Sequence, residues 1–118
     1  MGIKMKNLFM LIIFFTILIT TAFTQDKKVV EAEFKVSGNC NMCKSRIEKS
    51  VKITEVKYAK WNKSTKMLKV AFENSITADS LQRRVAEVGH DTEKYKANEE
   101  TYSDLPNCCL YRDKSKTH

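Results

Sequence analysis

Hydrophobic and polar residues alternate in three places along the middle of the chain, and each place predicts a strand with one buried face. Residues 30–36 show the clearest alternation, with valine, alanine and phenylalanine separated by glutamate and lysine. Residues 56–61 and 67–72 predict two more strands, and the polar residues 62–65 predict the turn between them. Residues 93–97 are weakly patterned and predict a short final strand.

Two stretches between these strands have helical spacing. Cys43, Ile47 and Val51 recur every four residues, which predicts a short amphipathic helix. A second helix is predicted from Thr77, a good N-cap residue, to Gly89, a residue typical of helix ends. The resulting order, βαββαβ, predicts an α+β fold. This fold is a ferredoxin-like sandwich whose antiparallel sheet carries two helices on one face.

The first 24 residues differ in composition from the rest of the chain. Lys4 and Lys6 are their only charged side chains, an apolar run covers residues 8–20, and small residues precede Gln25. This order is typical of a secretory signal peptide, so we expect cleavage before Gln25 and a periplasmic or secreted protein. The alternative is an uncleaved membrane anchor, because the uncharged residues 7–25 are almost long enough to cross a bilayer.

The rest of the chain is predicted to contain one small domain, residues 25–97, and a polar extension, residues 98–118. Apolar residues make up 42% of the chain, which excludes wholesale disorder. The net charge of +7 comes from basic and acidic residues that are interspersed, as on solvated faces, so we expect no nucleic-acid partner. All four cysteines follow the predicted cleavage point, so their chemistry decides which functions are open to the protein.

Cys40 and Cys43 form a Cys-x-x-Cys motif between the first predicted strand and the first predicted helix. A helix N-terminus carries unpaired N–H groups and a partial positive charge, which favour thiolate over thiol. Two thiolates that converge there select soft metal ions such as Cu(I) and Zn(II). The motif therefore predicts a metal site built from Cys40 and Cys43.

Residues 36–48, which read Val-Ser-Gly-Asn-Cys-Asn-Met-Cys-Lys-Ser-Arg-Ile-Glu, resemble the metal loop of heavy-metal-associated domains. The resemblance extends over residues 29–97 and is shared with copper chaperones, modules of metal-pumping ATPases and periplasmic mercury-binding proteins. It implies that Cys40 and Cys43 hold a soft ion at the surface, Cu(I) first and Zn(II) or Hg(II) as alternatives. It also implies a protein that is not an enzyme. Such a protein passes its ion by ligand exchange to a metal-transporting ATPase or another metal-accepting protein.

Two positions depart from that family. Gly38 stands where the family usually has a methionine packed under the metal loop. His90 follows the glycine of the second helix, where an aromatic residue is common. Because the loop of His90 lies beside the metal in these domains, its imidazole is a candidate ligand for Zn(II) or copper. The alternative is a solvated loop histidine.

Cys108 and Cys109 lie outside the part of the chain that resembles the family. They are candidate ligands that complete the site with Cys40, Cys43 and His90. Alternatively, one of them forms a disulfide with Cys40 or Cys43, or the pair forms a separate soft-metal site or a partner-docking thiol. Apolar neighbours predict that this stretch packs on the domain.

Two other functions use the same cysteines. A Cys-x-x-Cys pair at a helix N-terminus also serves thiol–disulfide oxidoreductases, and an exported protein would meet disulfide substrates. The third possibility is a set of purely structural disulfides. That arrangement needs two cross-links from Cys108 and Cys109 to the first pair, because adjacent cysteines pair with each other only under strain.

Overall fold

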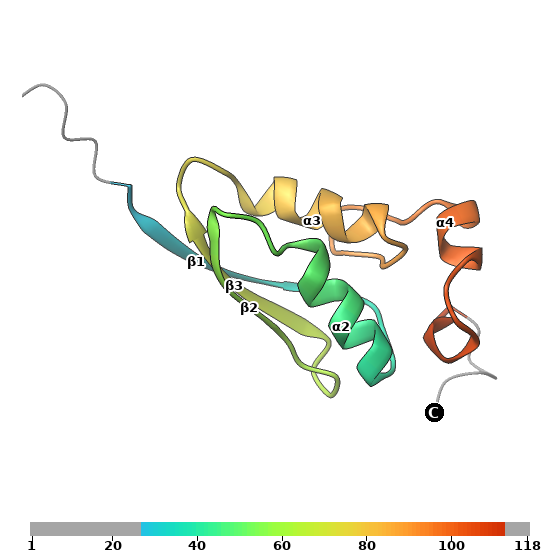
Figure 1. The fold of residues 1–118 in the computed structure, drawn as a ribbon. Helices are drawn as coiled ribbons and strands as arrows, with labels where there is room; N and C mark the ends of the chain where they lie inside the picture. Colours follow the sequence, from blue (N-terminus) through green and yellow to red (C-terminus); the bar gives the residue numbers. More distant parts are fainter. Residues whose placement is uncertain (1–26, 113–118) are drawn as a thin grey trace, which may run out of the picture.

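Three antiparallel strands form the sheet in the computed structural model, which describes residues 27–112 (Figure 1). The strands are β1 (Val29–Lys35), β2 (Val56–Trp61) and β3 (Met67–Glu73), and their order in the sheet is β1-β3-β2. Leu68 of β3 is paired with Phe34 of β1 on one side and with Trp61 of β2 on the other. The alternation in the sequence therefore predicted all three of these strands.

Helices α2 (Asn41–Ser50) and α3 (Ala78–Glu87) lie side by side on one face of the sheet, as Figure 1 shows. Thr77 caps α3, because its hydroxyl accepts a hydrogen bond from the backbone N–H of Ser80 at 3.1 Å. Gly89 ends the helical segment with a φ of +105°, a conformation that glycine adopts without a steric penalty. An α+β fold with an antiparallel sheet and two helices is thus confirmed.

The core lies between the sheet and these two helices. Each of its large side chains leaves at most 4% of its surface exposed. The strands contribute Phe34, Trp61, Leu68, Val70 and Phe72, and the helical segments contribute Ile47, Val51, Leu81 and Val85. Burial of this apolar surface stabilises the domain and fixes the position of the N-terminus of α2.

Residues 93–97 do not form the predicted final strand, so the prediction of a βαββαβ order was wrong in its last element. Among the described residues there is one isolated β-bridge, which pairs Thr92 with Val36, the residue that follows β1. Thr92 and Tyr95 instead close a turn, in which the N–H of Tyr95 donates to Thr92 Oγ1 at 3.0 Å. The N–H of Ala97 donates to the Asp91 carboxylate at 2.8 Å rather than to a strand. Local side-chain acceptors have replaced the sheet hydrogen bonds.

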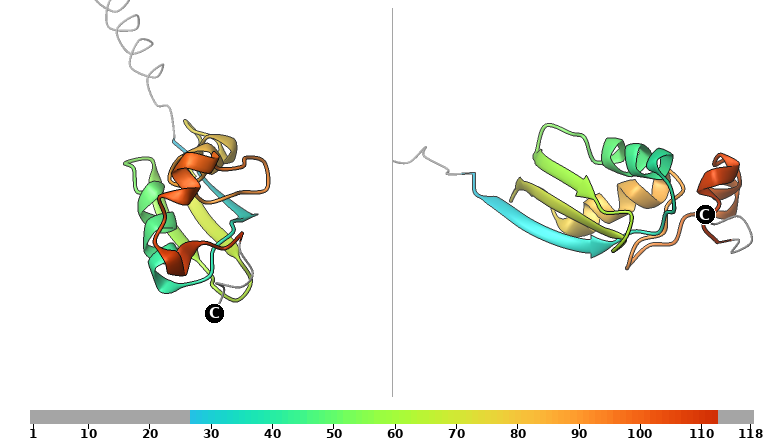
Figure 2. Two further views of the ribbon diagram at one scale, coloured as in Figure 1. Left: turned by 90° about the vertical axis from the view of Figure 1, so that its right-hand side faces the viewer. Right: turned by 90° about the horizontal axis from the view of Figure 1, so that it is seen from below.

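The part of the C-terminal extension that the structure describes packs on the domain. It contains α4 (Glu99–Ser103) and a short 3-10 helix, η1 (Asn107–Cys109), and η1 lies against α2 (Figure 2). Tyr102, Leu105 and Cys109 are buried. The boundaries expected at residues 24/25 and 97/98 stay predictions, and the expected signal segment lies outside the described residues. Within residues 27–112, no helix has the length and apolar character that a membrane crossing requires.

Candidate metal centre

Cys40 and Cys43 lie where the sequence placed them, at the N-terminus of α2. Cys40 is the N-cap residue, with an extended backbone, and Cys43 occupies the first turn. Their sulfur atoms are 3.2 Å apart. Cys43 is fully buried and also donates to Asn39 Oδ1 at 3.4 Å, whereas Cys40 is only partly buried. One sulfur of the motif is therefore reachable from solvent, and the other is held behind it.

The loop that leads from β1 to Cys40 is fastened by side chains from three other parts of the fold. Three consecutive backbone carbonyl groups each contact a side-chain nitrogen. The pairs are Trp61 Nε1 with Val36 (3.0 Å), His90 Nδ1 with Ser37 (2.8 Å), and Lys66 Nζ with Gly38 (2.6 Å). These bonds hold the backbone immediately before the first cysteine, so the loop is preorganised for its site.

Gly38 is required by the close approach of Trp61. A Cβ atom at position 38 would lie 3.1 Å from two atoms of the Trp61 ring and 3.1 Å from the Cβ of Cys43. The indole thus fills the space under the metal loop, where the resembling family usually packs a methionine. The departure at Gly38 is compensated by Trp61, and the loop is packed from below.

The extension brings a third sulfur to the motif. The sulfur of Cys109 lies 3.2 Å from that of Cys40, and the ligand atoms of Cys40, Cys43 and Cys109 all lie within 4.8 Å of one another. Cys109 is fully buried, and Arg46 Nη1 approaches its sulfur at 3.6 Å. The sequence offered Cys109 as a candidate ligand, and the structure places it in the cluster.

Cys108 borders the same cluster on its outer side. Its sulfur is 3.6 Å from that of Cys40 and 3.7 Å from that of Cys109. It also lies 3.5 Å from the thioether sulfur of Met42, a side chain that is 52% exposed. All four cysteines are free thiols in this structure, since sulfur–sulfur contacts of this length exceed the ~2.05 Å of a disulfide bond.

The three clustered thiols differ in acidity. Burial raises the pKa of Cys40, but hydrogen bonds from Cys43 and Cys109 outweigh burial and bring the pKa to about 7. Burial raises the pKa of Cys43, and it does the same for Cys109. Cys40 is therefore the thiol of the cluster that ionises first, close to neutral pH, and Cys43 and Cys109 can donate hydrogen bonds to its thiolate.

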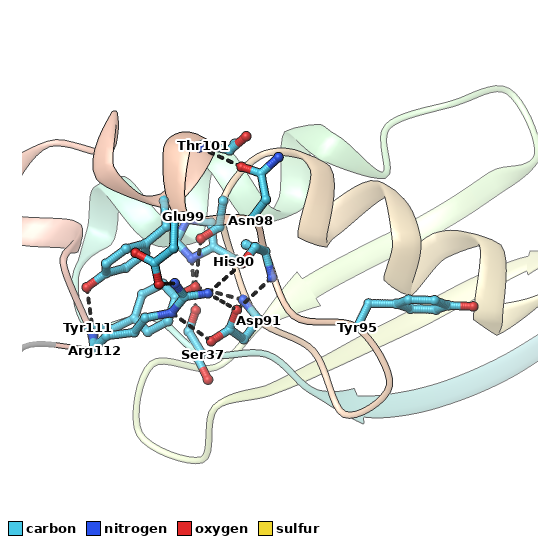
Figure 3. Close-up of polar contacts among 12 residues, drawn as sticks. Ser37, His90, Asp91, Tyr95, Asn98, Glu99, Thr101, Tyr111 and Arg112 are labelled. Atoms are coloured by element: carbon cyan, nitrogen blue, oxygen red, sulfur yellow. Dashed lines mark hydrogen bonds and ion pairs between the residues drawn. The ribbon is translucent and has the colours of Figure 1, made fainter.

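His90 does not join the sulfur cluster. Its Nδ1 contacts the carbonyl oxygen of Ser37, so this nitrogen carries the ring proton, and the ring stacks on Tyr111 with centroids 5.5 Å apart (Figure 3). Its Nε2 is buried and has no hydrogen-bond partner among the described residues. Burial lowers the pKa of His90 to about 4, so the ring is neutral at pH 7. The structure thus places His90 as a buried support of the loop rather than beside the three sulfurs.

The sequence pointed to Tyr111 as a residue that packs the extension on the domain, but it did not single out the ion pair between Arg112 and Asp91 that holds the extension in place. Arg112 donates to both carboxylate oxygens of Asp91, at 2.7 and 3.2 Å, as Figure 3 shows. The hydroxyl of Tyr111 donates to the carbonyl of Gly89 at 2.6 Å and accepts from the N–H of Asp91 at 2.8 Å. These bonds tie the end of the extension to the loop after α3, and they keep Cys109 over the N-terminus of α2.

The fold and the cluster together define an α+β ferredoxin-like domain that presents cysteine sulfurs at a helix N-terminus. Among solved structures, the chain is similar to the N-terminal domain of a potential copper-translocating P-type ATPase from Bacillus subtilis, solved in its Cu(I)-loaded state. The two are 28% identical with a TM-score of 0.51, and the match covers 55% of this chain and 85% of that one.

Two further structures share the fold. The water-soluble region of the P-type ATPase CopA from Bacillus subtilis is 27% identical with a TM-score of 0.52, over 58% of this chain and 47% of that one. The CopZ metallochaperone is 23% identical with a TM-score of 0.51, over 53% of this chain and 98% of that one. No model of a protein family matches the chain, and no curated protein sequence does so either.

Proposed function

We propose that this protein binds a soft metal ion, Cu(I) first and Zn(II) or Hg(II) as alternatives, and passes it to another protein. The observation that carries the proposal is the convergence of three cysteine sulfurs at the N-terminus of α2. Thiolates are the ligands that soft ions prefer. The similarity to the Cu(I)-loaded domain from Bacillus subtilis supports copper as the first choice.

The dimensions of the cluster suit such an ion. A metal–thiolate bond of about 2.3 Å places the sulfurs of a trigonal site about 4.0 Å apart. Cys40 lies 3.2 Å from Cys43 and 3.2 Å from Cys109, so each sulfur has to move outward by less than an ångström to admit the ion. The guanidinium of Arg46 beside Cys109 offsets part of the negative charge that three thiolates would bring.

The exposure of the three sulfurs indicates how an ion would leave. Cys40 is partly exposed, whereas Cys43 and Cys109 are buried. A thiolate of an acceptor protein therefore reaches the ion from the side of Cys40. It adds to the ion as a ligand, and the ligands of this chain then dissociate one after another. The reaction exchanges metal–sulfur bonds and needs no oxidant or reductant.

The acceptor we propose is a metal-transporting ATPase or another metal-accepting protein. Similarity to domains of two P-type ATPase structures supports it. We place this function outside the cytoplasm, on the ground of the signal-like residues 1–24. Sequencing the N-terminus of the mature protein from fractionated cells tests this location. A start at Gln25 in the exported fraction supports it, and an intact N-terminus in the cytoplasm contradicts it.

The metal site itself is tested by competition for Cu(I). The reduced chain is titrated against a Cu(I) chelator, and the titration is repeated with the double variant Cys40→Ser, Cys43→Ser. We expect the double variant to lose tight binding, while the matched variant Cys108→Ser keeps at least one tightly bound ion. Thermal unfolding of all three proteins shows whether each is folded. If the folded double variant holds Cu(I) as tightly as the original chain, the proposed function is wrong.

A thiol–disulfide oxidoreductase is the second candidate, and one observation favours it. A partly exposed Cys40 with Cys43 at 3.2 Å behind it resembles an attacking thiol and a resolving thiol. The two functions separate in an insulin-reduction assay. Turnover that Cys40→Ser abolishes would favour the enzyme, whereas no turnover together with tight Cu(I) binding favours metal transfer.

A further inference from the structure

The four cysteine sulfurs form two triangles that share one edge. Cys40 and Cys109 make the shared edge, which is 3.2 Å long. Cys43 completes the inner triangle, and Cys108 completes the outer one. We propose that the cluster holds two Cu(I) ions, one in each triangle, with the sulfurs of Cys40 and Cys109 as bridges. This inference rests on the proposed function and extends it from one ion to two.

The outer triangle fits an ion as well as the inner one does. Its sides measure 3.2, 3.6 and 3.7 Å, close to the roughly 4.0 Å that three thiolates around one ion would require. A thiolate has more than one lone pair, so it can bind two soft ions at once. A single ion in the inner triangle would give Cys108 no role as a ligand, although the Cys108 sulfur lies within 4 Å of the sulfurs of both Cys40 and Cys109.

Met42 supplies a further soft donor on the outer side. Its thioether sulfur lies 3.5 Å from the sulfur of Cys108, and the side chain is 52% exposed although it is large and apolar. Thioethers bind Cu(I) but have little affinity for Zn(II), so this donor favours copper over zinc at the outer position. The outer ion is also the more accessible one, because Met42 and Cys108 face solvent more than Cys43 does.

The charge of the cluster does not oppose a second ion. One Cu(I) with three thiolates leaves two negative charges. Two Cu(I) ions with four thiolates leave the same two negative charges, because the second ion and the thiolate of Cys108 cancel. Arg46, whose Nη1 lies 3.6 Å from the Cys109 sulfur, faces the same residual charge in both states. The second ion therefore adds bonds without adding net charge to a partly buried site.

The two positions imply an order of loading and release. Two of the three sulfurs around the inner ion, those of Cys43 and Cys109, are buried, whereas the outer ion borders solvent through Met42 and Cys108. The outer ion is consequently the one that an acceptor thiolate reaches first. The chain would deliver one Cu(I) readily and retain the other more tightly.

The experiment counts copper atoms per chain. The reduced chain is loaded with excess Cu(I) without oxygen, freed of unbound metal by gel filtration, and analysed for copper, protein and molecular mass. X-ray absorption then tests for a copper–copper neighbour. We expect two copper atoms per monomer and a copper–copper neighbour. Cys108→Ser should hold one copper atom and lose that neighbour. Met42→Leu should release the second atom at a several-fold lower chelator concentration, and Met67→Leu, a methionine on β3, should not.

Several outcomes would overturn the two-ion cluster. They are saturation at one copper atom per chain, retention of the second atom in Cys108→Ser, or a second atom found only in a dimer. If the single atom then depends on Cys40 and Cys43, the proposed function survives without the second site. If Cu(I) does not bind tightly at all, both proposals fail.

Discussion

The sulfur of Cys109 lies 3.2 Å from the sulfur of Cys40, although the two cysteines are 69 positions apart in the chain. This contact joins the C-terminal extension to the start of α2. A two-cysteine motif at a helix N-terminus leaves its ion open to an acceptor. A third sulfur from the same chain makes that ion more tightly held and slower to leave. We therefore propose that the extension converts an open metal site into one that its own chain closes.

Removal of this third sulfur should weaken binding and speed release. We expect Cys109→Ser to lower the affinity for Cu(I) by about tenfold or more, equal to about 1.4 kcal/mol. Transfer to an acceptor thiol should become faster, because fewer metal–sulfur bonds have to break. Chelator competition measures the affinity, and stopped-flow mixing with a copper-accepting domain measures the rate. Unchanged affinity and unchanged rate would show that Cys109 is a bystander.

The ion pair between Arg112 and Asp91 should be required for the closed site. Arg112 is 19% exposed and makes two hydrogen bonds to Asp91, and its guanidinium lies 4.2 Å from the Tyr102 ring centroid. We expect Arg112→Ala to lower the free energy of unfolding by about 2–3 kcal/mol, since its bonds are charged and partly buried. We also expect it to reduce Cu(I) affinity toward that of Cys109→Ser, because the extension is released.

Arg83→Ala is the matched control for that prediction. Arg83 is 63% exposed, and its contact with Asp79 is 4.0 Å long. Such a surface pair contributes about 0–1 kcal/mol, so this variant should unfold like the original chain and bind Cu(I) normally. Denaturant unfolding and chelator competition on both variants provide the comparison. Equal losses in the two variants would contradict a specific role for Arg112.

The strands and main helices could be predicted from the sequence because their stability comes from periodic burial. Every second residue of β1 from Ala32 onward turns toward the core, and this pattern is visible without the structure. The strand expected at residues 93–97 does not form, because the backbone there hydrogen-bonds to one particular side chain instead of to a neighbouring strand. The Asp91 carboxylate takes the N–H of Ala97, and no periodicity encodes that bond.

The approach of Cys40 to Cys43 could be predicted from the local sequence, whereas the approach of Cys109 to them depends on long-range packing. Cys40 and Cys43 are near in sequence, and their helix aligns them. Cys109 reaches them only because the extension folds back. One signal of this packing was present: Tyr102, Leu105 and Cys109 are spaced by three and four residues, as on one buried face.

The burial of His90 should make the stability of the protein depend on pH. The pKa of His90 falls from its ordinary 6.5 to about 4 because burial disfavours the charged ring. Between pH 6.5 and about 4, the His90 side chain is therefore protonated in the unfolded chain but neutral in the folded chain. Stability from this residue is complete above pH 6.5 and is lost as the pH falls toward about 4. Denaturant unfolding at a series of pH values across this window measures the loss.

The variant His90→Phe tests whether His90 causes that loss. Phenylalanine fills the buried position and does not titrate, so the pH dependence in this window should flatten. Stability at neutral pH should change by about 1 kcal/mol or less, the value of the lost bond to Ser37. Copper affinity should stay within about twofold, since His90 is outside the sulfur cluster and the bonds from Trp61 and Lys66 still hold the metal loop. A large loss of affinity in the folded variant would return His90 to the set of ligands.

Gly38 and Trp61 should show energetic coupling, because they compete for one space under the metal loop. Gly38→Met restores the side chain that the resembling family usually has, but its Cβ would lie 3.1 Å from the Trp61 ring. We expect this variant to lose about 1–3 kcal/mol of stability by overpacking. Trp61→Phe removes the two ring atoms that Gly38 would contact, and also the indole N–H that donates to the Val36 carbonyl at 3.0 Å.

A double-mutant cycle separates the packing conflict from the lost hydrogen bond. Trp61→Phe alone should be destabilising, since it opens a cavity and leaves the carbonyl of Val36 without its donor. In that background, Gly38→Met fills the vacated space and should cost little or become stabilising. The coupling free energy should then be about 1 kcal/mol or more in favour of the double variant. Additive effects would mean that the loop, not the indole, accommodates the new side chain.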